Sequence, residues 1–127
     1  MNKGFAVPAI VLTAILAFCL WNGAAMSSRA TRWREQLDTA EQRVDSGDWR
    51  GALQALEDGY TDWAACQTWL HCVTSHDAVD EAEAMYHRAA AFVQSEEESE
   101  FRAEVAGLRE QLRLLAEMEE FSLRNVL

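Results

Sequence analysis

A long uncharged segment near the start constrains this chain more than any other feature. No charged residue occurs in residues 4–28, and from Phe5 the sequence reads FAVPAIVLTAILAFCLW. About 20 apolar residues, each rising about 1.5 Å along a helix, cover a bilayer hydrocarbon core of about 30 Å. The pattern therefore predicts a transmembrane helix, and it divides the chain into a membrane anchor, residues 1–27, and a helical domain, residues 28–127.

A cleaved signal peptide is the main alternative to a retained anchor. Lys3 gives the segment a charged start, and Gly23, Ala24 and Ala25 offer a small-residue cleavage site. The apolar stretch is longer than the core of about 7–15 residues that is usual in signal peptides, which favours an uncleaved, single-pass anchor. A lipoprotein signal is discarded because the bulky Phe18 would precede the modified cysteine.

Charges beside the segment bear on its orientation. Lys3 precedes it, whereas Arg29, Arg32 and Arg34 follow it. Because positive charge gathers on the cytoplasmic side of membrane segments, this count alone favours a cytoplasmic domain.

The rest of the chain is acidic and has the pattern of helices only. With 11 Lys and Arg against 21 Asp and Glu, the formal net charge is -10. Such a charge repels phosphate backbones and argues against nucleic-acid binding. The single proline is Pro8, and no later stretch alternates as strands do. We therefore expect an all-α protein: an N-terminal transmembrane helix followed by an antiparallel bundle of about four helices.

The first two bundle helices follow from apolar spacing and one turn. Trp33, Leu37, Ala40 and Val44 form a stripe with three- and four-residue spacing that should end near Gly47, because glycine tolerates left-handed backbone. Asp48 can then cap a second helix. The apolar face expected on that helix runs past Cys66 and consists of Trp49, Leu53, Leu56, Tyr60, Trp63 and Leu70.

Two further helices complete the expected bundle. The third carries an apolar face of Val79, Ala82, Tyr86, Ala89 and Val93. Ser95 with Glu98 matches the capping-box pattern for the start of the fourth. The seam of that last helix consists of Phe101, Val105, Leu108, Leu112, Leu115 and Met118, with Phe121 beyond it.

Four metal-binding residue types cluster in the middle of the chain, at Cys66, His71, Cys72 and His76. The spacing does not match the paired short loops of a structural zinc site. Buried cysteine is also commonly a small apolar residue. A metal- or thiol-based sensor that uses Cys66, Cys72 and His76 is therefore the alternative function, not the preferred one, and we predict neither a metal site nor a cofactor.

Acid–base pairs such as His87 with Glu83 arise by chance in any acidic helix, and neither a serine nucleophile motif nor a glycine-rich phosphate loop accompanies them. We therefore expect no enzyme activity and no small-molecule substrate. The expected partners are membrane lipid, through the N-terminal helix, and an unidentified protein.

Several landmarks together resemble a known bacterial family. They are the apolar start, GDW opening a helix, Trp63, His76 followed by Val79 and Asp80, and the closing EEFSLRNVL. The chain is similar over nearly its whole length to domain-of-unknown-function family 4363, small one-pass proteins found mainly in Gram-positive bacteria. The family-motif residues, which are also the candidate interaction residues, are His76, Asp80, Ser122, Leu123, Asn125, Val126 and Leu127.

This resemblance implies an N-terminal anchor in the cytoplasmic membrane and a helical domain outside it; it implies no activity. The chain departs from the family pattern in its strongly acidic character, in having only arginine as a basic residue after Lys3, and in its additional Cys66 and Cys72. We expect a structural or protein-interaction module at the cell envelope. The apolar tail from Ser122 is expected to fold back on the bundle, the alternative being that it docks on a partner or on the membrane surface.

Overall fold

The computed structural model contains four α-helices in the part of the chain that it describes. In chain order they are α1 (Lys3–Asp45), α2 (Trp49–Ala64), α4 (His76–Gln94) and α5 (Glu98–Val126). The structure describes the backbone of residues 3–67 and 76–126, and the side chains of the same ranges other than residues 3, 19, 22–27, 119–120 and 122–126.

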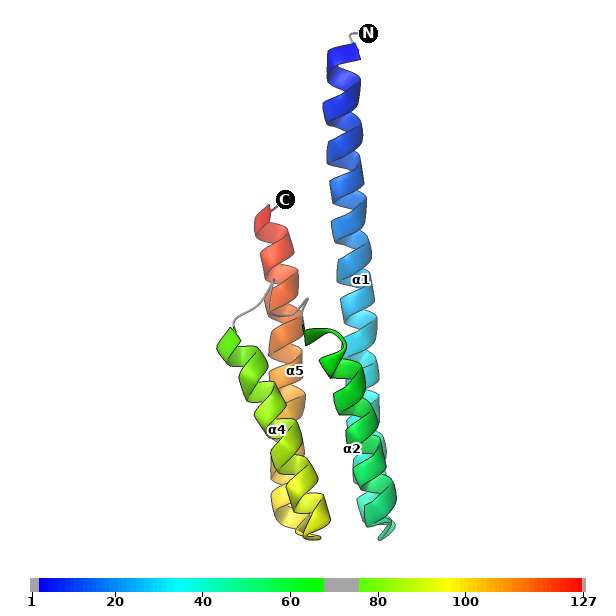
Figure 1. Ribbon diagram of the computed structural model, residues 1–127, viewed down its shortest axis with the longest axis vertical. Coiled ribbons are helices and arrows are strands. Elements are labelled where there is room, and N and C mark those ends of the chain that lie inside the picture. Colours follow the sequence, from blue (N-terminus) through cyan, green and yellow to red (C-terminus); the bar gives the residue numbers. More distant parts are fainter. Residues whose placement is uncertain (1–2, 68–75, 127) are drawn as a thin grey trace.

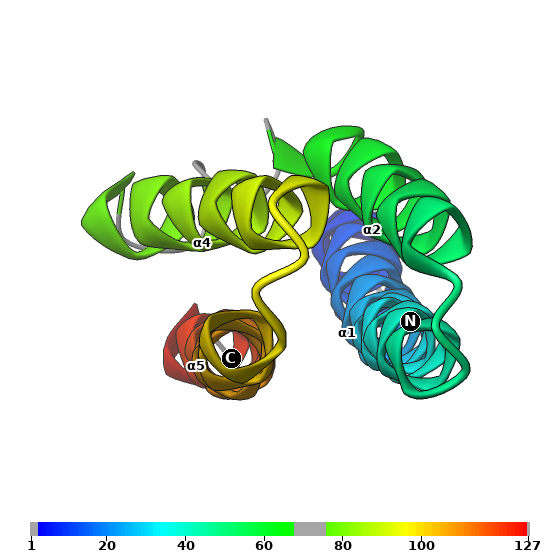
Figure 2. The same cartoon turned by 90° about the horizontal axis from the view of Figure 1, so that it is seen from below.

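These helices form an antiparallel bundle. Helix α1 packs against α2 and α5, and α4 packs against the same two helices. Seen along the bundle in Figure 2, α2 and α4 form one layer over α1 and α5. Successive helices run in opposite directions, so the N-terminal part of α1 and the C-terminal end of α5 point the same way (Figure 1). The predicted all-α antiparallel bundle is confirmed.

Helix α1 is much longer than its neighbours, with 43 residues in one helix. Its second half lies in the bundle, whereas its first half projects beyond it (Figure 1). The large apolar side chains that this first half exposes are Phe5, Val7, Ile10, Val11, Leu12, Ile15, Leu16, Phe18, Leu20 and Trp21. Within the described residues, no helix is both long enough and apolar enough to cross a bilayer. The described part of the chain therefore gives no support to the expected transmembrane span.

The turn between α1 and α2 forms as predicted. Gly47 has a φ of 79°, and its N–H donates to the carbonyl of Val44 at 3.0 Å, while the N–H of Asp48 donates to Arg43 at 2.8 Å. This paired arrangement is a common glycine-ended helix stop. The Asp48 carboxylate accepts from the N–H of Gly51 at 2.9 Å, so the predicted N-cap is confirmed.

The turn between α4 and α5 has the same geometry without a glycine. Glu96 has a φ of 54°, and the N–H groups of Glu96 and Glu97 donate to carbonyls in the last turns of α4 at 3.1 and 2.9 Å. The Ser95 hydroxyl donates to the carbonyl of Ala91 at 3.0 Å, so it closes α4 and does not open α5. The predicted capping box of Ser95 with Glu98 is therefore wrong.

The bundle core consists of one cluster of apolar side chains. The predicted stripes on α1 and α4 are buried as expected, as is the α5 seam as far as Leu115. On α2 the buried positions include the small residues Ala52 and Gly59, and Gly59 lets the backbone approach Gln36 of α1 closely. The core residues are Ala30, Trp33, Leu37, Ala40, Val44, Ala52, Leu56, Trp63, Val79, Ala82, Tyr86, Ala89, Val93, Phe101, Val105, Leu108, Leu112 and Leu115.

Helix α2 is shorter than its apolar pattern predicts. It ends at Ala64, and the N–H of Cys66 donates to the carbonyl of Trp63 at 2.9 Å. This bond, made three residues back instead of four, tightens and terminates the helix. The expected continuation to Leu70 falls partly outside the described residues. Cys66 therefore lies beyond the end of α2 and not on it.

The seam of α5 ends earlier than predicted. Met118 is 36% exposed and Phe121 is 65% exposed. Both lie where α5 extends past the described ends of α2 and α4 (Figure 1), so these two helices do not cover them.

Ion pairs mark the register between α1 and α5. Arg102 pairs with Asp45, and Arg109 pairs with Asp38. Arg109 also donates to Glu41 at 2.6 Å. Pairs as exposed as these contribute little stability singly. They nevertheless show which levels of the two antiparallel helices lie side by side.

Candidate functional site

The predicted motif residues lie toward the end of the bundle from which α1 projects (Figure 1). His76 begins α4, with its side chain exposed, and Asp80 follows one turn later, also exposed; Val79 between them is fully buried. The end of α5 points the same way (Figure 1). The arrangement therefore leaves the His76 and Asp80 side chains on the surface while the aliphatic residue between them holds α4 to the core.

The C-terminal motif is described at the level of its backbone. Helix α5 continues through Val126, so residues 122–126 extend the helix. The expected fold-back of the tail is wrong for these residues, because an unbroken helix cannot reverse its direction. The side chains of Ser122, Leu123, Asn125 and Val126, and all of Leu127, lie outside the described residues.

The suggested sensor residues are only partly described. Cys66 is half-buried just after α2. Cys72, and with it His71, lies outside the described residues. Among the residues that are described, no group of three or more His, Cys, Asp or Glu side chains is placed to hold a metal ion.

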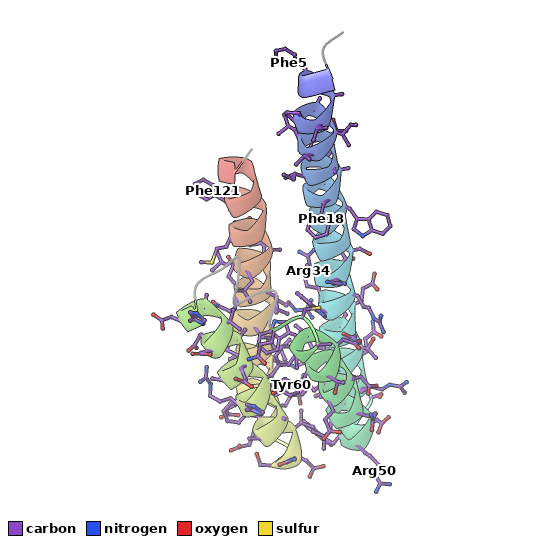
Figure 3. All side chains as sticks on the ribbon, turned by 45° about the horizontal axis from the view of Figure 1, so that its top comes forward. Phe5, Phe18, Arg34, Arg50, Tyr60 and Phe121 are labelled. Atoms are coloured by element: carbon purple, nitrogen blue, oxygen red, sulfur yellow. The ribbon has the colours of Figure 1, made fainter. Side chains whose placement is uncertain are left out.

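The densest arrangement of polar and aromatic groups lies where α2 and α4 meet. The ring of Tyr60 lies 6.1 Å from that of Trp63, 5.7 Å from that of Tyr86 and 5.1 Å from that of His87, measured between ring centres. Trp63 and Tyr86 are 5.5 Å apart. These separations suit attractive tilted and edge-on ring contacts. We call these four residues the aromatic cluster; Figure 3 shows Tyr60 between the helices.

Polar residues of α1, α2 and α4 surround the aromatic cluster. The Tyr60 hydroxyl donates to Glu83 at 2.9 Å. Nearby, the side-chain amide of Gln36 donates to Asp62 at 2.7 Å, and Arg32 pairs with the same carboxylate at 3.1 Å. The contacts of Gln36 and Arg32 with Asp62 therefore link α1 to α2, and the hydrogen bond from Tyr60 to Glu83 links α2 to α4.

Three buried polar atoms in this region have no hydrogen-bond partner among the described residues: Gln36 Oε1, Trp63 Nε1 and the Tyr86 hydroxyl. Burying such a group without a partner costs about 1–3 kcal/mol. The region therefore carries an energetic cost that an all-apolar core would not have.

Both phenols of the cluster are held in their protonated form. The hydrogen bond to Glu83 is the main cause that raises the pKa of Tyr60, with burial second. Burial, followed by the negative charge of Asp62, raises the pKa of Tyr86 well above its usual value. At neutral pH these groups can donate hydrogen bonds but cannot act as phenolate nucleophiles. The arrangement is suited to packing and orienting helices.

Sequence reasoning placed Tyr60, Trp63 and Tyr86 on apolar faces but missed their polar surroundings. Gln36 and Asp62 look like ordinary surface residues of acidic helices. No spacing rule indicates that two residues from different helices share a hydrogen bond, so the network becomes visible only once the helices are paired.

Comparison with known proteins identifies one family. The family described as Domain of unknown function (DUF4363) matches residues 20–126, which include α2, α4, α5 and the half of α1 that lies in the bundle. Neither the comparison with curated proteins nor that with solved structures found a match. The matched residues include the His76 and Asp80 motif and the C-terminal motif as far as Val126. This chain belongs to the DUF4363 family.

Proposed function

We propose that this protein is a single-pass, membrane-tethered helical module that serves a structural or protein-interaction role at the cell envelope. The observation that carries the proposal is the division of α1. One unbroken helix presents an exposed apolar half and then a half whose stripe is buried in the bundle. A helix of this kind joins a lipid-facing segment to a folded domain.

The exposed half of α1 is expensive to leave in water. Its large side chains include Phe5 at 73% exposure, Ile10 at 67% and Leu20 at 64%. Burying one large apolar side chain is worth about 1.5–3 kcal/mol. Continuous exposed apolar patches mark contact sites for membranes or proteins. The complete sequence of residues 4–28, which lacks any charge, supports lipid as the contact.

The bundle lies on the outer side of the cytoplasmic membrane in this proposal. Its support is the resemblance to small one-pass proteins, whereas the arginines that follow the apolar segment favour the opposite orientation. Labelling Cys66 in intact cells with a membrane-impermeant maleimide, in a Cys19→Ala, Cys72→Ser background, tests the orientation. Labelling only after lysis would place the domain inside.

Extraction of membranes tests the tether. The full chain should stay in the membrane pellet after alkaline carbonate treatment. A Val11→Arg, Ile15→Arg variant should move to the supernatant, because each arginine at the centre of a span costs about 2.5–3.5 kcal/mol. The matched control is Gln54→Arg, which adds a charge to the exposed face of α2 and should remain in the pellet. Recovery of the parent protein in the supernatant would refute the tether.

The interaction role rests on the character of the bundle surface. Its described arginines are largely committed to ion pairs within the bundle, which leaves an acidic exterior. A photo-crosslinking residue at Asp80 tests this role in cells. A discrete crosslinked protein, absent when the same residue replaces Gln54, is the expected result. A pattern no different from that of Gln54 would count against a specific partner at the motif.

A further inference from the structure

We infer that the C-terminal end of α5 is a second membrane contact, with Phe121 at the phospholipid headgroup boundary beside the point where α1 leaves the bilayer. This inference rests on the proposed tether and goes beyond it, because it assigns lipid contact to a helix that is remote from the anchor in the sequence.

The register of the two helices carries the first step. Moving along α5 from Arg102 to Arg109 corresponds to moving the same number of residues back along α1, from Asp45 to Asp38. Continuing at the common rise of about 1.5 Å per residue brings Val126 level with Trp21. Figure 1 shows α5 ending alongside the first half of α1.

Trp21 marks the edge of the apolar run, and it is 76% exposed. Tryptophan is enriched at the boundary between hydrocarbon and headgroups. If α1 is the tether, a helix that is antiparallel to it and ends at this level must end at the membrane surface. This holds whichever side of the membrane the bundle occupies.

The exposed side chains at this end of α5 suit that surface. Phe121 is 65% exposed, and Met118, one turn earlier, is 36% exposed. Figure 3 shows Phe121 near the end of α5 and away from the bundle core. An aromatic ring placed beside the anchor at the water boundary gains contact with lipid without any rearrangement of the bundle.

Charge at this end fits phosphate groups. Six described arginines, Arg32, Arg43, Arg88, Arg102, Arg109 and Arg113, pair with carboxylates, whereas Arg34 and Arg50, which lie farther from the apolar segment than Arg29, have no ion pair among the described residues. Arg29, the first charged residue after the apolar segment, is exposed and has no ion pair among the described residues. In a chain with a net charge of -10, an unpaired arginine that is level with Met118 in this register is complementary to lipid phosphates.

A depth measurement on the full chain tests the inference. Cys19, Cys66 and Cys72 are replaced by alanine or serine, and a single cysteine with an environment-sensitive fluorophore is placed at Phe121, Ile15 or Gln94. The protein is reconstituted at one copy per phospholipid nanodisc, and quenching by lipids with a nitroxide on the headgroup is measured. Circular dichroism confirms that each labelled protein keeps the parent helix content and melting temperature.

The expected result is at least twofold stronger headgroup-nitroxide quenching at Phe121 than at Gln94, which lies at the opposite end of the bundle. Lipids with the nitroxide deep in the acyl chain should instead quench Ile15 most. Quenching at Phe121 equal to that at Gln94, with Ile15 quenched by the deep probe, would overturn the inference while leaving the tether in place. A lack of quenching at Ile15 would overturn both. Quenching at Phe121 that appears only when two copies share a disc would assign the surface to a second copy instead and also overturn the inference.

Discussion

At the scale of single residues, the buried polar atoms of the bundle are its least expected feature. Tyr86 is only 3% exposed, yet its hydroxyl has no partner among the described residues. Tyr60, on the same cluster, has a partner in Glu83. Two tyrosines in one cluster therefore contribute to stability in opposite ways through their hydroxyls, and this contrast can be measured.

Replacing Tyr86 by phenylalanine should leave the free energy of unfolding unchanged or raise it by up to about 1 kcal/mol, because the variant no longer buries an unpartnered hydroxyl. Tyr60→Phe is the matched control and should lower it by about 1 kcal/mol through loss of the bond to Glu83. Urea unfolding followed by circular dichroism gives both values. A loss above 1 kcal/mol in Tyr86→Phe would show that its hydroxyl has a partner.

The same tyrosines predict an alkaline limit to stability. The pKa values of Tyr60 and Tyr86 are raised in the folded protein. The unfolded chain therefore loses these protons first, near the ordinary tyrosine pKa of about 10. The contribution of the two protonated phenols to the free energy of unfolding is fully present below about pH 10. It is lost as the pH rises from there toward the pKa values of the folded protein. The urea concentration at the midpoint of unfolding should decrease as the pH is raised from about 9 to about 11.5. The decrease should be smaller in a Tyr60→Phe, Tyr86→Phe double variant.

At the scale of elements, the two described turns show what the sequence can and cannot indicate. Gly47 predicts the end of α1, and Asp48 predicts the N-cap of α2; both predictions are confirmed. At the second turn Glu96 takes the left-handed conformation that glycine takes at the first. Nothing in a run of glutamates marks one of them for that role, so Ser95 was assigned to the wrong helix.

Glu96→Gly should raise the free energy of unfolding by about 0.5–1 kcal/mol, since left-handed backbone costs a side-chain-bearing residue about 1–2 kcal/mol and glycine's unfolded-state entropy returns part of the gain. The reciprocal change Gly47→Ala should lower it by about 1 kcal/mol. Thermal melts of both variants, taken at one pH, test the pair. Destabilisation by Glu96→Gly would show that the glutamate side chain has a stabilising role that outweighs the backbone strain.

Element ends were predicted less well than element faces. The apolar faces of α1, α4 and most of α5 follow directly from three- and four-residue spacing, because burial selects that spacing. The end of α2 at Ala64 is marked by the backbone bond from Cys66 to Trp63, and the exposure of Phe121 depends on where α2 and α4 end; local spacing encodes neither. The Gln36–Asp62 bond likewise needs the helices to be paired first.

At the scale of the whole molecule, one helix serves two environments. The stripe of α1 that includes Trp33, which is 1% exposed, belongs to the bundle core. Phe5, on the same helix, is 73% exposed and touches no core. The second half of α1 therefore contributes to the stability of the bundle, whereas the first half, although it belongs to the same helix, is expected to contribute to membrane attachment and not to bundle stability.

Trp33→Ala should lower the free energy of unfolding of the bundle by about 3–5 kcal/mol, because it opens a cavity in the core. Phe5→Ala, its counterpart on the projecting half, should leave bundle stability unchanged within about 0.5 kcal/mol. Denaturation of the full chain in mild detergent, monitored by the fluorescence of the remaining bundle tryptophans, measures both. A large effect of Phe5→Ala would mean that the projecting half is packed against protein.

Helix α1 passes from its apolar half into the bundle without a break in its backbone. Under the proposed anchoring, no flexible linker therefore separates the membrane segment from the bundle. A tilt or axial rotation of the segment of α1 within the membrane is transmitted directly to the bundle. A partner therefore contacts the bundle at a defined distance from the membrane and in a defined orientation.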